Sequence, residues 1–316
     1  MTNKSKKAKR LMILGNGFDL SCKRQTSYSD FRSYLINKYG VDENKEITFA
    51  PDTAISPNGD VDYDKSNLAE WYVKLIDNSE DIAEINKWSK YEEILGYLDY
   101  DSVLDNDMND YGDDDDEWIQ AYNNEDMCTN IFNSVLFAHN LFSDWIYYIQ
   151  KKPAEINAKC NQLLSYPNTY FLNFNYTDTL EKYVGIKSSN ITHIHGYAND
   201  NDNLIVGHHK FQKYNHESDP SKSKLNELDE DLEKNVTNII KENSPFFDSL
   251  HDITEIYFFG FSFGEVDLPY IEKIFEYTSN PTCYLNCFNP EDLKAQREIL
   301  TQRLGLDINK IKTYQV

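Results

Sequence analysis

Short apolar runs alternate with helix-like segments along the chain, and each run ends in small or polar residues. Runs of this length, flanked by glycine or asparagine, are typical of strands that are buried on both faces of a sheet. Strands that alternate with helices predict an α/β fold with a doubly wound, Rossmann-like parallel sheet. The strands expected in this sheet are residues 11–14, 170–174, 192–195, 256–259 and 283–287, with one more short strand at 204–206.

A long segment with a helical pattern separates the first two predicted strands. Over residues 41–165, aromatic and aliphatic residues recur at helical spacing, and Asp126–Lys152 predicts one long packed helix. We therefore expect an α/β domain over residues 11–316 that is interrupted by a large helical insertion. Residues 213–250 are polar and predict a surface helix or a mobile loop. The tryptophans expected to anchor the core of the insertion are Trp71, Trp88 and Trp145.

Charge is concentrated in the insertion. The formal net charge is −22, and residues 41–130 hold 26 acidic residues against five lysines, a net of −21. Such a surface repels nucleic-acid backbones, so the balance argues against a nucleic-acid-binding protein. Residues 1–10 are basic and lack the apolar core of a secretion signal, which predicts a disordered leader. No apolar run is long enough to span a bilayer, so no membrane partner is expected.

The acidic stretch Asp105–Glu117 has alternating carboxylates ahead of Gly112, as calcium loops do. Tyr111 and Trp118, however, occupy positions where a calcium loop needs oxygen ligands. A solvated loop is the favoured interpretation. The five cysteines form no CxxC pair, which argues against a zinc ribbon and predicts reduced thiols in a cytoplasmic protein.

The first strand ends in Gly15-Asn16-Gly17, with Asp19 two residues later. The glycines are consistent with a tight strand-to-helix turn, and equally with a turn that lets a phosphate reach backbone N–H groups. The full dinucleotide fingerprint is absent, because Leu20 stands where its third glycine would be.

The other strand ends also carry polar residues. Asn173 and Asn175 end the second strand, and four of the seven histidines fall within the seventeen residues 193–209. Because parallel strands end at one edge of a sheet, we expect these residues to line one pocket. Either asparagine is a candidate, and Asn175 is preferred. A histidine such as His195 could also be a core residue bonded to backbone. The residues expected in the pocket are Asn16, Asp19, Asn175, His195 and Ser262.

Six segments together resemble the AbiH family of bacteriophage abortive-infection proteins. They are GNGFD, TSYSDF, WSKYEEILG, FNYTDTLE, HIHG and GFSFGEVD, and the resemblance covers residues 11–290. AbiH proteins are in turn distantly similar to the sirtuin-like NAD-binding fold. That resemblance implies contacts to NAD from Gly15, Asn16, Gly17, Asn175, His195, Gly196, Gly260 and Ser262.

The resemblance implies a cytoplasmic anti-phage effector that hydrolyses NAD without a metal. The missing zinc ribbon and the extra Thr177 depart from the sirtuin-like pattern, and they argue against deacetylation. Asn175 would position water or a ribose hydroxyl, and His195 would act as general base. Asp19 or Asp267 would accept hydrogen bonds from ribose. A phage trigger, a partner protein and self-association stay open.

Two other classes of function stay open at this stage. One is a metal-dependent nuclease or phosphodiesterase that uses the histidines with Asp19 or Asp267 as ligands. The other is a nucleotide-binding sensor that has no catalytic activity and acts through a partner. The histidines of the metal alternative are His193, His195, His208 and His209.

Overall fold

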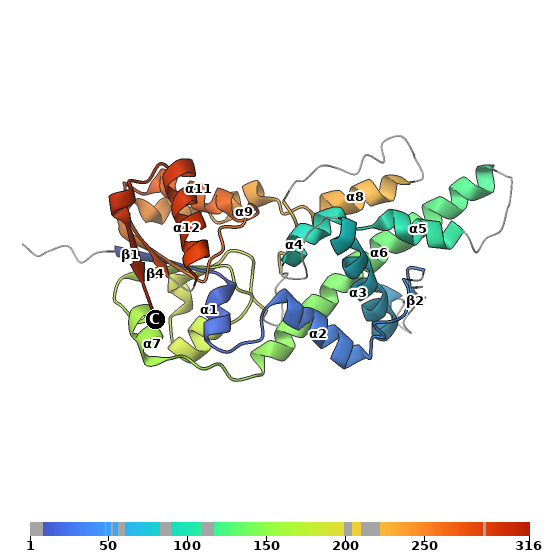
Figure 1. Cartoon of the computed structure of the whole chain (residues 1–316), viewed down its shortest axis with the longest axis horizontal. Coiled ribbons are helices and arrows are strands. Elements are labelled where there is room, and N and C mark those ends of the chain that lie inside the picture. The colour runs from blue at the N-terminus through green and yellow to red at the C-terminus, as the bar shows by residue number, and fades with distance from the viewer. Residues whose placement is uncertain are drawn as a thin grey trace, which may run out of the picture. The chain divides into compact units, whose positions relative to one another are not determined.

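The chain forms two compact units, a sheet unit and a helical unit (Figure 1). The sheet unit comprises Met1–Thr26, Ile146–Ile205 and Asn235–Val316, and the helical unit comprises Ser27–Trp145 and Val206–Lys234. The computed structural model describes residues 9–47, 49–51, 53–55, 61–82, 90–108, 117–198, 204–209, 222–286 and 289–316.

Six parallel strands form the sheet, in the order β5-β4-β1-β6-β7-β8. They are β1 (Lys9–Leu14), β4 (Thr169–Asn173), β5 (Ile191–His193), β6 (Ile253–Phe259), β7 (Thr282–Asn286) and β8 (Ile311–Tyr314). From β1 the chain adds β4 and β5 on one side, then β6, β7 and β8 on the other. This is the strand order of dinucleotide-binding folds, with its switch point at β1. The predicted doubly wound α/β fold is confirmed.

Alternating side chains of β1 give the sheet unit two cores, one on each face. Leu11 and Ile13 belong to one core, and Met12 and Leu14 belong to the other. The first core is completed by α9 (Val236–Glu242), α10 (Ser244–Asp248), α11 (Leu268–Tyr277), α12 (Pro290–Glu298) and η8 (Ile299–Arg303). The second is completed by α1 (Asn16–Ser21), α7 (Ala158–Leu164) and the π-helical turn η3 (Leu180–Val184). Short 3-10 turns are η4 (Ser188–Asn190), η7 (Ser249–Asp252) and η9 (Ile308–Lys310).

Aromatic side chains form the centre of the helical unit. The Phe31 ring lies 5.1 Å from Trp145 and 5.3 Å from Phe142, centroid to centroid. Trp71 is also buried, as predicted. The helices are α2 (Tyr28–Tyr39), α3 (Lys65–Ile82), α4 (Tyr91–Ile94), η2 (Leu95–Tyr97), α5 (Tyr100–Met108), α8 (Ser223–Leu232) and most of α6 (Glu117–Gln150), beside a hairpin of β2 (Ala54–Ile55) and β3 (Val61–Asp62).

A buried ion pair joins distant segments of the helical unit. Glu92 accepts hydrogen bonds from the Tyr28 hydroxyl at 2.8 Å and from Lys234 Nζ at 2.9 Å. The Lys234 side chain is fully buried, so removal of Glu92 would leave an uncompensated charge in the interior. Two of the sequence segments that carry the family resemblance, TSYSDF and WSKYEEILG, therefore meet in one contact.

The observed strands differ from the predicted ones in several places. β5 ends at His193, two residues before its predicted end, and β6 begins at Ile253, three residues before its predicted start. β1 begins at Lys9, inside the predicted leader, because Lys9 and Arg10 form ion pairs with Asp252 and Glu255. Residues 204–206 form no strand, although His208 makes an isolated bridge with Glu233. β8 was not predicted. Trp88 and residues 109–116 of the acidic stretch lie outside the described residues.

Glycines bring two loops of the sheet unit into backbone contact. Gly15 N–H donates to the Phe259 carbonyl at 3.1 Å, and Gly17 N–H donates to the Gly260 carbonyl at 3.0 Å. A Cβ added to Gly260 would lie 2.4 Å from the Gly17 carbonyl carbon, which is closer than any Cβ can approach. The turn after β1 and the loop after β6 can therefore meet only as glycine backbones.

We expect Gly260→Ala to lower the free energy of unfolding by about 3 kcal/mol or more, from steric overlap in addition to left-handed backbone strain. Gly305→Ala is the matched control, since Gly305 has a φ of +67° against +61° for Gly260 but no atom within 4 Å of an added Cβ. Its expected cost is about 1 kcal/mol. Urea denaturation of both variants measures the difference. Equal decreases in the free energy of unfolding for the two variants would show that the backbone contact between Gly17 and Gly260 is not tight.

Candidate functional site at the carboxyl edge of the sheet

Four neighbouring strands end in line at one edge of the sheet. Leu14 pairs with Asn173 and with Phe259, and Asn173 pairs with His193. Residues that follow these strand ends therefore lie along the same edge, on both sides of the switch point. This is where doubly wound sheets bind ligands. The predicted site residues that follow these ends are Gly15, Asn16, Gly17, Asp19, Asn175, His195, Gly196, Gly260, Ser262 and Asp267.

Asn175 is held by its amide nitrogen. Nδ2 donates to the Gly15 carbonyl at 3.1 Å and to Asn173 Oδ1 at 2.9 Å. Both amide hydrogens therefore have acceptors, and the side chain links β4 to the glycine turn after β1. Among the described residues, none donates a hydrogen bond to Asn175 Oδ1. That oxygen is the atom available to a ligand.

His195 lies in an aromatic surround beside a carboxylate. Its ring packs edge-on against Phe174 at 5.3 Å and Tyr270 at 5.6 Å, centroid to centroid. Its Nε2 lies 3.7 Å from Asp267 Oδ1, and 3 % of the side chain is exposed. Asp267 stands immediately before α11, so the loop after β6 supplies the acid that faces the histidine. A carboxylate at this distance stabilises a protonated imidazole.

Asn16 and Asp19 have protein partners of their own. The Asn16 side chain donates to the Thr26 carbonyl at 2.9 Å and accepts from the Thr26 hydroxyl at 2.6 Å. Asp19 is fully buried, and its two oxygens accept hydrogen bonds from Thr177 at 2.6 Å and Thr179 at 2.7 Å. These contacts join the turn after β1 to the loop after β4. The extra Thr177 noted in the sequence thus holds Asp19.

Burial raises the pKa of the Asp19 carboxyl, although the two threonine hydroxyls and the nearby Arg24 oppose the shift. The Arg24 side chain is itself buried and lies 3.7 Å from Asp178 Oδ1, with a hydrogen bond to the Ile149 carbonyl at 3.1 Å. Asp19 is therefore part of a buried polar network that fixes the loops of the site.

The glycines and Ser262 complete the predicted set. The N–H groups of Gly15 and Gly17 donate to the carbonyls of Phe259, the last residue of β6, and of Gly260, so a phosphate would have to meet other donors at this edge. Ser262 is exposed in that loop, and Gly196 follows His195 with a φ of 73°. The positive φ turns the chain sharply after β5.

Glu181 and Tyr270 are contacts of the site that the sequence did not indicate. Glu181 Oε1 lies 2.8 Å from His193 Nε2, and Tyr270 packs on His195. Glu181 closes the segment FNYTDTLE, which is the signal that could have identified it. Tyr270 lies in α11 and carries no sequence signal of its own.

Two of the histidines of the metal alternative lie in the sheet unit and face different acids, Glu181 for His193 and Asp267 for His195. In the described part of the chain, no three His, Cys, Asp or Glu side chains are placed to hold a metal ion.

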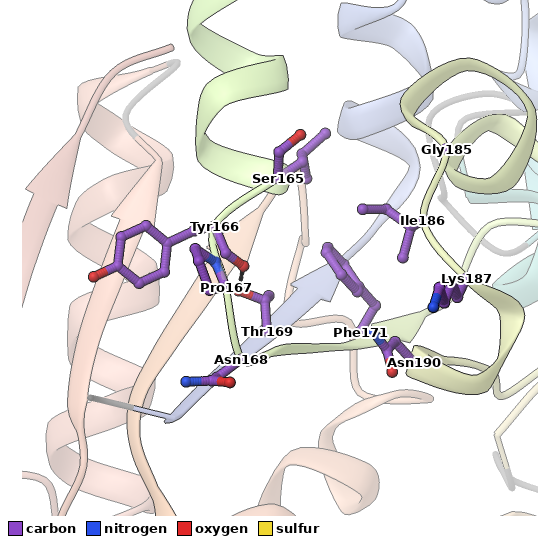
Figure 2. A pocket seen from close by; sticks show the side chains of 11 residues that line it. Ser165, Tyr166, Pro167, Asn168, Thr169, Phe171, Gly185, Ile186, Lys187 and Asn190 are labelled. Atoms are coloured by element: carbon purple, nitrogen blue, oxygen red, sulfur yellow. Dashed lines mark hydrogen bonds between the residues drawn. The ribbon is translucent and has the colours of Figure 1, made fainter. Parts of the chain in front are cut away.

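A pocket of about 300 Å³ lies at the opposite, amino-terminal end of β4. Figure 2 shows it between the segment that leads into β4 and the turn around Ile186 and Lys187. Four of its polar lining residues, Ser165, Asn168, Lys187 and Asn190, are exposed, and Thr169 is buried. This surface depression is separate from the carboxyl-edge residues.

The strand order and the polar carboxyl edge define a doubly wound α/β protein with a candidate ligand site at its switch point. The chain belongs to the AbiH family, bacteriophage abortive infection AbiH, whose family model matches residues 11–288. This membership supports a role in bacteriophage abortive infection. No curated protein matches the chain. None of the described helices has the length and apolar character needed to cross a membrane.

Asp19→Asn should change how stability depends on pH. The folded carboxyl keeps its proton to a higher pH than the unfolded chain, whose pKa is about 3.9, so a rise in pH removes stability from the wild type. The asparagine variant has no such proton. The free energy of unfolding of the wild type minus that of Asp19→Asn should therefore fall between pH 4.5 and 8 in urea titrations. A difference that rises with pH would contradict the burial effect.

Proposed function

We propose that this protein acts in abortive infection by binding NAD at the carboxyl edge of the sheet and hydrolysing its nicotinamide–ribose bond. The observation that carries the proposal is the fixed amide of Asn175, held at the switch point by the Gly15 carbonyl, beside the pair that His195 after β5 forms with Asp267 after β6. The dinucleotide-binding strand order supports the same ligand class.

The proposed reaction replaces the bond from ribose to nicotinamide with a bond to water. Water attacks the ribose C1′, nicotinamide leaves with the bonding electrons, and the proton of the water passes to His195. The products are ADP-ribose, nicotinamide and one proton. Because only 3 % of the His195 side chain is exposed, a bridging water would carry the proton to the ring.

Asn175 and Asp267 have supporting roles in this reaction. Asn175 Oδ1 would accept a hydrogen bond from a ribose hydroxyl or from the attacking water, which fixes the reacting groups in place. Asp267 would stabilise His195 once it is protonated. The partial negative charge of Asn175 Oδ1 would stabilise the positive charge that develops at C1′ in the oxocarbenium-like transition state.

Loss of NAD explains how such an enzyme would protect a bacterial population. An infected cell without NAD cannot support phage replication, so the infection ends with that cell. The metal-dependent nuclease alternative would use His193 as a ligand, yet both of its ring nitrogens face protein groups. The sensor alternative predicts NAD binding without turnover.

Asn175→Ala and His195→Ala should each lower the rate of nicotinamide release by roughly a hundredfold or more, since the first removes the group proposed to fix the reacting groups and the second removes the proposed general base. The measurement is nicotinamide release by the purified protein, together with the NAD content of infected cells. Both variants should also lose phage protection while keeping the thermal stability of the wild type within a few degrees.

His251→Ala is the control for this experiment. His251 is an exposed histidine of the same unit in η7, just before β6, at the opposite edge of the sheet. Its removal should leave turnover unchanged. Effective protection with an unchanged NAD content would falsify the hydrolase proposal, and tight binding without turnover would favour the sensor.

A further inference from the structure

A continuous chain of polar side chains leads from Glu181 to Asn175. Glu181 Oε1 lies 2.8 Å from His193 Nε2, and His193 Nδ1 lies 3.5 Å from Asn173 Nδ2. Asn173 Oδ1 then accepts from the backbone N–H of Asn175 at 3.1 Å and from its side-chain Nδ2 at 2.9 Å. All four side chains belong to the sheet unit, and the last of them reaches the Gly15 carbonyl.

The chemistry of these groups fixes the orientation of Asn173. A backbone N–H can only donate, so the Asn173 atom facing it must be the oxygen, and Asn173 Nδ2 must face His193. An ionised Glu181 can only accept, so His193 Nε2 donates to Glu181 Oε1. His193 Nδ1 lies 3.5 Å from Asn173 Nδ2, from which it can accept, and 3.4 Å from the Asn175 backbone carbonyl, to which it can donate. Either hydrogen bond ties the His193 ring to the Asn173–Asn175 pair.

The pairing of donors with acceptors also fixes the orientation of the Asn175 amide. The two groups that face its amide, the Gly15 carbonyl and Asn173 Oδ1, are both acceptors, so the atom between them must be Nδ2. A flipped Asn175 would place Oδ1 against two oxygens. Asn173 and Asn175 are shielded from water, with exposed fractions of 1 % and 5 %. Water therefore cannot easily replace a hydrogen bond that either side chain loses.

We infer that Glu181, His193 and Asn173 are positioning residues that hold the Asn175 amide in one orientation and so present its Oδ1 to the nucleotide. This inference rests on the proposed function for the role of Asn175 in turnover. It assigns different tasks to the two asparagines and to the two histidines. Asn175 contacts the ligand and His195 takes the proton of the attacking water, whereas Asn173 and His193 act through Asn175.

Packing offers a competing explanation for His193. Its ring stacks on Tyr197 with centroids 4.4 Å apart, and 8 % of its side chain is exposed. If His193 acts only by stacking on Tyr197, an aromatic ring without nitrogen should support the same activity. If His193 positions Asn175, a smaller side chain with a polar atom at the place of Nδ1 should support more activity than such a ring. Two substitutions separate these explanations.

His193→Asn keeps a hydrogen-bonding atom at the position of Nδ1 and removes the ring. His193→Phe keeps a ring for Tyr197 and removes both nitrogens. We expect kcat for NAD hydrolysis to fall roughly tenfold or more in His193→Phe, with KM within about twofold of the wild type. His193→Asn should stay within about threefold of the wild-type kcat. The reverse order, with the phenylalanine variant more active, would overturn the inference in favour of packing.

A second measurement does not depend on NAD turnover. In protein labelled with ¹⁵N-asparagine, the side-chain amide protons of Asn175 should exchange slowly with water in the wild type and in His193→Asn, and faster by about tenfold in His193→Phe. Thermal unfolding checks that each variant folds. Equal exchange in all three proteins would overturn the positioning role. If the exchange rates differ as expected while the wild type releases no nicotinamide, the hydrolase proposal fails and the positioning role stands.

Discussion

The carboxyl edge of the sheet depends on the backbone contact of Gly15 and Gly17 with Gly260. The loops after β1 and β6 start on adjacent strands, and their backbones meet at distances that exclude any side chain at these positions. Two hydrogen bonds, from Gly15 to Phe259 and from Gly17 to Gly260, close the contact. The Gly15 carbonyl accepts from the Phe18 backbone N–H at 2.9 Å and from the Asn175 amide at 3.1 Å, so the glycine turn also fixes the position of Asn175.

The backbone contact decides between the two interpretations of the motif Gly15-Asn16-Gly17. The sequence leaves two interpretations open, a tight turn or a phosphate cradle, and the structure gives both N–H groups of the glycines to protein carbonyls. The glycines serve the site by bringing two strand ends together. Asp19 and Asn16 serve it in a similar way, because their polar atoms bind Thr177, Thr179 and Thr26.

Apolar periodicity was sufficient to predict the central strands, since strands buried on both faces leave unbroken apolar runs. It could not predict β8, whose sequence IKTY buries only Ile311 at the edge of the sheet. The strand ends indicated which polar residues share an edge, because parallel strands all end there. They could not indicate partners such as Glu181 or Tyr270, which reach the edge from η3 and α11 through tertiary packing. Nor could they show that Asp19 is buried.

The central claim is that the carboxyl edge, and Asn175 in particular, receives NAD. A crystal structure of His195→Ala with NAD tests it most directly, because the variant should bind the substrate without consuming it. We expect the nicotinamide ribose of bound NAD to lie within hydrogen-bond distance of Asn175 Oδ1. NAD bound elsewhere, for example in the pocket at the amino-terminal end of β4, or no bound NAD at saturating concentration, would contradict it.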